Sequence, residues 1–107
     1  MPSESIALTE AVFYILLSLH SPLHGYGIMQ KVADLSAGRV RLAAGTLYGA
    51  ISALLEKGWI RALPGEAHSR KKEYEITAPG KAAAAKELSR LRELVSNGAR
   101  IVAGGSK

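Results

Sequence analysis

The chain of 107 residues has 48% hydrophobic side chains and a formal net charge of +5, which indicates one small domain with enough apolar material for a core. It contains no cysteine, which excludes disulfides, thiol catalysis and a cysteine-built zinc site. The apolar stretch 11–19 is far shorter than the roughly 20 residues of a membrane span, and the first residues lack the basic start of a secretory signal. We therefore expect a cytoplasmic protein without a membrane partner.

The charge is distributed unevenly along the chain. Residues 1–56 carry three basic and four acidic side chains, whereas residues 57–107 carry eleven basic and five acidic ones. A basic segment suggests an anionic partner such as nucleic acid, although a solvated basic surface would have the same composition.

Two helices are expected in the first third of the chain. Thr9 can cap a helix that runs to about Leu19 and is apolar on most sides, which is typical of a helix buried on more than one face. Pro22 ends it. A second helix is predicted over about 25–36, and the alternating residues 39–42 suggest a short strand. The inward positions of the second helix are Ile28, Met29, Val32 and Leu35.

A third helix is predicted from Ala44 to Gly58, and one of its faces is unusually smooth. Its inner face consists of Leu47, Ile51, Leu54 and Leu55. A surface helix normally covers its outer face with charged side chains. Here the outer positions are the small residues Gly45, Gly49, Ser52 and Ala53, and the hydroxyls of Thr46 and Tyr48 lie near the start.

The remaining residues predict a hairpin and a long helix. Residues 59–63 and 73–77 resemble two strands, joined by a loop whose tip carries Arg70, Lys71 and Lys72. Pro79 suits the first turn of a last helix, which is predicted to reach about Ile101. Its apolar stripe consists of Ala84, Leu88, Leu91, Leu94 and Val95.

This order predicts a mainly α fold with a small β-hairpin: a winged helix-turn-helix domain over residues 1–78, followed by a C-terminal dimerisation helix and tail over 79–107. In such domains the third helix enters the major groove of double-stranded DNA, which requires an outer face without bulk. The expected DNA-binding residues are Gly45, Thr46, Tyr48, Gly49, Ser52, Arg70, Lys71 and Lys72. The expected dimerisation residues are Phe13 and Leu17 on the first helix, and Leu88, Leu91, Leu94 and Val95 on the last.

Four stretches in order along the chain resemble the PadR family of transcriptional regulators. They are residues 24–28 (HGYGI), 45–48 (GTLY), 54–60 (LLEKGWI) and 70–77 (RKKEYEIT), with Gly80 behind the last. The resemblance implies a homodimeric DNA-binding repressor of the compact branch, with a single C-terminal helix. It also implies a response to small hydrophobic or aromatic effectors.

The sequence departs from the family pattern at two places. Gly49 replaces the proline that commonly follows the third-helix motif, and residues 79–107 contain no aromatic side chain. A drug-stacking pocket built from the last helix is therefore not expected. The one tryptophan, Trp59, is expected to be buried at the base of the wing.

Other functions have weaker support in the sequence. His20 and His24 have a ligand-like spacing, but Pro22 between them breaks the helix that would align them, so no metal site is predicted. No cofactor motif or catalytic arrangement is present, so we do not expect an enzyme. The serious alternative is a winged helix used only for protein interaction, as in an anti-repressor.

Overall fold

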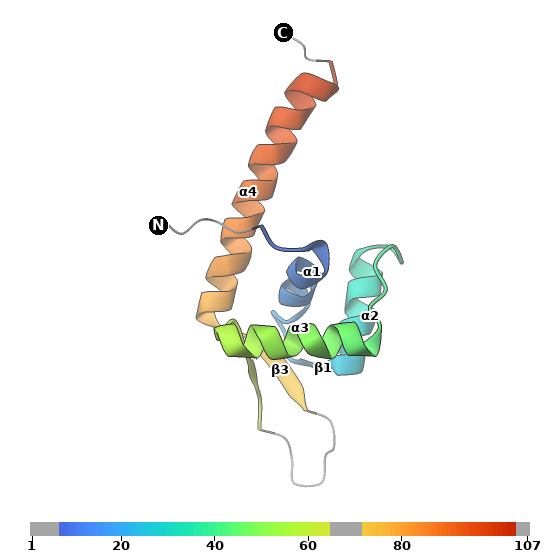
Figure 1. The fold of residues 1–107 in the computed structure, drawn as a ribbon, viewed down its shortest axis with the longest axis vertical. Helices are drawn as coiled ribbons and strands as arrows, with labels where there is room; N and C mark the ends of the chain where they lie inside the picture. The colour runs from blue at the N-terminus through green and yellow to red at the C-terminus, as the bar shows by residue number, and fades with distance from the viewer. Residues whose placement is uncertain (1–6, 65–71, 105–107) are drawn as a thin grey trace.

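The computed structural model describes residues 7–64 and 72–104, which form four helices and a small antiparallel sheet (Figure 1). This confirms the predicted fold class. The elements in chain order are α1 (Glu10–Ser18), β1 (Leu23–His24), α2 (Gly25–Leu35), α3 (Ala44–Lys57), β2 (Ile60–Ala62), β3 (Glu73–Ile76) and α4 (Ala78–Val102). None of the helices in these ranges is long and apolar enough to cross a membrane.

Helix α1 forms the centre of the core, because it packs against both α2 and α4. The hydroxyl of Thr9 accepts a hydrogen bond from the Val12 backbone N–H at 3.1 Å and so caps its first turn. The side chains of Ile15, Leu16 and Leu19 are fully buried. Buried residues of α2, α3, the sheet and α4 complete one continuous apolar cluster.

The sheet has one more strand than the sequence predicted. Strands β2 and β3 form the expected hairpin, with Ile60 opposite Ile76. On the other edge of β3, the two-residue strand β1 pairs antiparallel, with Leu23 opposite Tyr74. Two residues are too few to show alternation, so β1 carries no sequence signal of its own.

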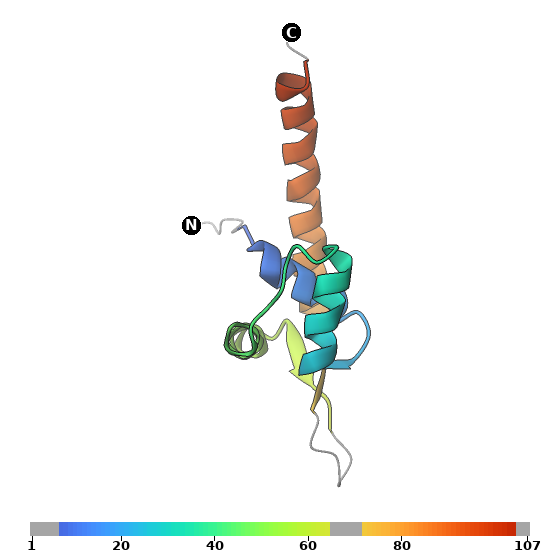
Figure 2. The ribbon, with the colours of Figure 1, turned by 90° about the vertical axis from the view of Figure 1, so that its right-hand side faces the viewer.

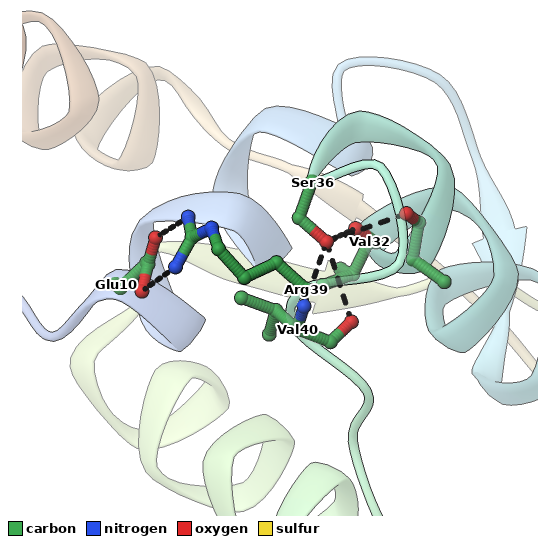
Figure 3. Close-up of polar contacts among 6 residues, drawn as sticks. Glu10, Val32, Ser36, Arg39 and Val40 are labelled. Carbon is green, nitrogen blue, oxygen red and sulfur yellow. Dashed lines mark hydrogen bonds and ion pairs between the residues drawn. The ribbon is translucent and has the colours of Figure 1, made fainter.

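The short strand predicted at residues 39–42 is wrong, because a capped turn occupies this region instead (Figure 3). The Ser36 hydroxyl donates to the Val32 carbonyl and accepts from the Val40 backbone N–H, both at 2.9 Å. Ala37 and Gly38 have φ of 55° and 81°, which reverses the chain direction after α2. Arg39 then forms an ion pair with Glu10 at the start of α1, so the connection to α3 is attached to the core.

Two leucines expected inside are largely exposed. Leu35 is 45% exposed and Leu55 is 38% exposed. Leu35 is the last residue of α2, and Leu55 lies beside the buried stripe of Leu47, Ile51 and Leu54 on α3. The other predicted positions of α2 are buried or half-buried.

Helix α4 begins as predicted and then leaves the body of the protein. Thr77 caps its first turn by accepting from the Gly80 N–H at 3.2 Å, and Pro79 lies in that turn. A Cβ at position 80 would lie 2.9 Å from the backbone carbonyl carbon of Trp59, so only glycine allows this close approach. The second half of α4 projects away from the other helices (Figures 1 and 2).

Candidate nucleic-acid interface

The outer face of α3 is exposed and unobstructed. Gly45, Thr46, Gly49 and Ser52 are all exposed, and a Cβ at either glycine would have no other atom within 4 Å. Over residues 45–53, small side chains cover this face, which can approach another surface closely there, and the exposed Glu56 lies on the same face in the last turn. The helix lies at the edge of the molecule, beside the base of the hairpin (Figures 1 and 2).

The N-terminus of α3 is also open. Ala43 provides no side-chain hydrogen bond to the first turn, and that turn contains no acidic residue. The first backbone N–H groups of a helix carry a partial positive charge and favour anions. The start of α3 is therefore suited to a phosphate group.

Tyr48 links α3 to the first turn of α2. The side chain is 48% exposed, and its phenol end lies directly against Gly25. A Cβ at position 25 would be 2.8 Å from the ring carbon Cζ of Tyr48, and closer still to the hydroxyl. The Tyr48 ring therefore rests on the start of α2. The pKa of the Tyr74 phenol is raised, mainly by burial and secondly by the nearby Tyr48.

Gly25 was not among the site residues predicted from the sequence. The absence of a side chain at the start of α2 creates the space that Tyr48 occupies. Gly25 lies in the stretch 24–28 that resembles the family, and it is a glycine at a helix start, where a capping residue or a good helix former is the usual choice. Its partner lies 23 positions away in the sequence, so spacing could not connect the two.

One of the three basic residues predicted on the wing lies within the described residues. Lys72 is exposed at the start of β3, whereas Arg70 and Lys71 lie outside the described residues. The Glu75 carboxylate accepts from Arg61 Nε at 2.6 Å across the β2–β3 ladder. Glu75 is therefore neutralised within the sheet, away from the wing tip.

The apolar stripe of α4 lacks a cover over most of its length. Ala84 is buried against the body, but Leu94 is 52% and Val95 is 70% exposed. Leu88 is exposed and Leu91 is half-buried. The exposed Ile101 and Val102 extend the apolar surface beyond the predicted stripe. Such a long exposed apolar surface is typical of an association site.

The expected α1 side of this association surface is also accessible. Phe13 and Leu17 are half-buried and point away from the buried stripe of α1. Phe13 packs at the edge of the core, whereas Leu17 is not among the residues packed against it. Both side chains therefore retain surface that a second molecule can bury.

The comparisons with known proteins give the family. A family model described as the transcriptional regulator PadR-like family matches residues 13–86, which is more than half of the chain. The chain belongs to this family. Its members are transcriptional regulators and not enzymes, so this PadR-family chain has the fold and general role of a DNA-binding regulator.

Solved structures show the same fold. A PadR-family regulator from Clostridium difficile R20291 has a TM-score of 0.75 at 19% identity, over 88% of this chain and 99% of that one. A transcriptional regulator from Clostridium thermocellum has a TM-score of 0.73 at 20% identity, over 87% and 92%. Bordetella bronchiseptica BpsR, whose DNA binding is regulated by 6-hydroxynicotinic acid, has a TM-score of 0.65 at 18% identity, over 86% and 61%. A comparison with curated proteins gives no match.

The two histidines that had a ligand-like spacing have structural partners in this PadR-family protein. The Nδ1 atom of His20 donates to the Leu16 carbonyl at 3.1 Å. The Nδ1 atom of His24 accepts from the Gly27 N–H at 3.2 Å and so caps α2. Within residues 7–64 and 72–104, no group of three or more potential metal ligands is present.

Proposed function

We propose that this PadR-family chain is a homodimeric repressor that binds a pseudo-palindromic operator with α3 in the major groove. The observation that supports it most strongly is the exposed outer face of α3, where Gly45 and Gly49 leave open space above the backbone. The major groove is about 12 Å wide and admits a helix closely only when its side chains are small. Residues 1–78 then form the DNA-binding unit.

Polar groups around α3 are placed to contact phosphates of the DNA backbone. Thr46 is exposed in the first turn, and Tyr48 is half exposed at the flank of the same turn. Their hydroxyls can donate to phosphate oxygens, which fixes the position of the helix along the duplex. The basic residues Arg70, Lys71 and Lys72 are assigned to the flanking backbone or minor groove, where cations are favoured.

The dimer is formed by residues 79–107. The stripe of Leu88, Leu91, Leu94 and Val95 packs on Phe13 and Leu17 of the second copy. Because the two copies are identical, a closed two-fold interface buries the same stripe twice. A two-fold dimer presents its two α3 helices to two half-sites on the DNA. The centres of these half-sites lie about 34–36 Å apart when one helical turn of the DNA separates them.

Release by a small hydrophobic or aromatic effector completes the proposal. The regulation of BpsR by 6-hydroxynicotinic acid provides an example in a protein of the same overall fold.

Selection of bound duplexes from a random library tests the proposed function. We expect enrichment of a sequence with two inverted half-sites, and a mass in sedimentation equal to two chains. The protein-interaction alternative predicts a folded protein that enriches no sequence, and that result would replace the repressor assignment.

A further inference from the structure

The polar side chains of α3 determine which chemical groups of a base pair the helix can recognise. The helix contains no arginine, asparagine or glutamine, which are the residues that bond most specifically to guanine and adenine in the major groove. Discrimination between bases must therefore come from the polar side chains that α3 does contain. They are Thr46, Tyr48, Ser52, Glu56 and Lys57.

Two of these side chains are held against other parts of the protein. The phenol end of Tyr48 lies against Gly25 at the start of α2, which places its hydroxyl at the flank of α3. The Nζ atom of Lys57 lies 5.2 Å from the centroid of the Trp59 ring, which is a cation–π distance. Trp59 is half-buried at the base of the wing, and not fully buried as expected, so its ring is accessible to Lys57. Neither Tyr48 nor Lys57 is therefore directed to a base edge.

Two others are poorly suited to distinguishing bases. Glu56 lies in the last turn of α3, about 15 Å along the helix axis from Thr46. The first residues of a recognition helix reach the base edges, so the end of α3 lies nearer the phosphates, which repel a carboxylate. Ser52 is exposed on the outer face, but a single hydroxyl bonds to several of the bases.

Thr46 differs from the other four because it has a methyl group and lies in the first turn. Its side chain is exposed, and Gly45 and Gly49 beside it leave open space above the helix backbone. A base edge can therefore approach Thr46 closely. The hydroxyl and the methyl group of a threonine point in different directions from Cβ, so the hydroxyl can donate to a phosphate while the methyl group faces the groove.

We propose that the methyl group of Thr46 contacts thymine methyl groups in the operator and makes the chain prefer thymine at those positions. This assignment rests on the proposed function, because it requires α3 to lie in the major groove. Thymine is the one standard base that presents a methyl group there, and the threonine methyl group is one of its usual apolar contacts. Burial of one methyl group changes a binding constant about fourfold.

Replacing the thymines of a selected duplex one at a time by deoxyuridine tests the assignment, because only the methyl group is removed. With the full chain, fluorescence anisotropy should show an affinity about fourfold lower for at least one thymine in each half-site. Thr46→Ser removes the methyl group from the protein and keeps the hydroxyl. It should lose about as much with the thymine duplex, and lose nothing more when that thymine is replaced.

Thr9→Ser is the matched control, because it removes the same methyl group outside α3 and serine also caps a helix. It should bind each duplex like the parent. Thr46→Ser should melt like the parent, since Thr46 is exposed.

Two results would overturn the proposal while leaving the proposed function intact. One is equal affinity of the parent for all the deoxyuridine duplexes. The other is a loss with deoxyuridine that is the same for the parent and for Thr46→Ser, which would show that the thymine methyl group acts through the shape of the duplex. Failure to select any duplex would instead overturn both the proposed function and this assignment.

Discussion

Gly25→Ala should weaken DNA binding without weakening the fold, because it displaces Tyr48. The new Cβ would lie 2.8 Å from the Tyr48 ring carbon Cζ, below the distance that real contacts allow. The ring is half exposed, so it can rotate toward solvent while the backbone stays in place. Alanine in the first turn of α2 also favours the helix by about 0.5–1 kcal/mol over glycine. We therefore expect the free energy of unfolding to stay within about 1 kcal/mol of the parent.

The affinity for DNA should fall because the Tyr48 hydroxyl leaves its position. One hydrogen bond to a charged group contributes roughly 1.5–3 kcal/mol, and 1 kcal/mol corresponds to about a fivefold change in affinity. Tyr48→Phe removes the same hydroxyl without moving the ring, so it should cause a similar loss with little change in melting temperature. Because both substitutions remove one interaction, the double variant should lose no more than either single variant.

Fluorescence anisotropy with a selected duplex and thermal melting on the same preparations provide the measurements. If Gly25→Ala binds like the parent, the position of Tyr48 over α2 has no role in DNA binding. If the two losses add, Gly25 affects DNA through something other than Tyr48. Either result would refute the reasoning.

Three further predictions concern the dimer, the wing and α4. Leu91→Glu should give monomers or unfolded protein in sedimentation, whereas Ser89→Glu, exposed on another side of α4, should leave a dimer; a stable dimer of Leu91→Glu would contradict the proposed interface. Replacing Arg70, Lys71 and Lys72 by alanine should flatten the salt dependence of duplex binding by up to about three units, and an unchanged slope would make the wing ordinary solvated surface. Because Arg90 lowers the pKa of Glu87, the stabilisation from Glu87 is complete above the unfolded pKa of about 4.3 and is lost as pH falls toward the lower folded value. Between about pH 5 and about pH 3, the melting temperature of Glu87→Gln should therefore fall less than that of the parent. An equal fall in both proteins would show that the Glu87–Arg90 pair adds no stability.

Local signals in the sequence were sufficient for most of the fold. Thr9 marks a helix start through capping, Gly58 marks a helix end through the left-handed conformation that glycine adopts readily, and Pro79 marks the first turn of α4, as the structure has them. These signals depend only on near neighbours in the chain. The helices and the hairpin were therefore predictable within a few residues.

The features that the sequence did not reveal depend on residues far apart in the chain. Strand β1 forms by pairing with the free edge of β3. Charged and apolar residues alternate in the segment 39–42 as in a strand, but the Val40 backbone N–H donates to the Ser36 hydroxyl. The space for Tyr48 depends on Gly25. The pattern of residues within one segment does not show which distant segments come into contact with it.

The central claim is that the smooth face of α3 enters the major groove of DNA. The most direct test compares Ser52→Arg with Ser96→Arg, because both positions are exposed and both substitutions add the same charge and bulk. Added positive charge alone should raise non-specific affinity for DNA in both variants. We predict that Ser52→Arg loses specific operator binding while remaining a folded dimer, and that Ser96→Arg binds the operator like the parent. If Ser52→Arg also binds the operator like the parent, α3 does not enter the groove and the protein-interaction alternative is the better account.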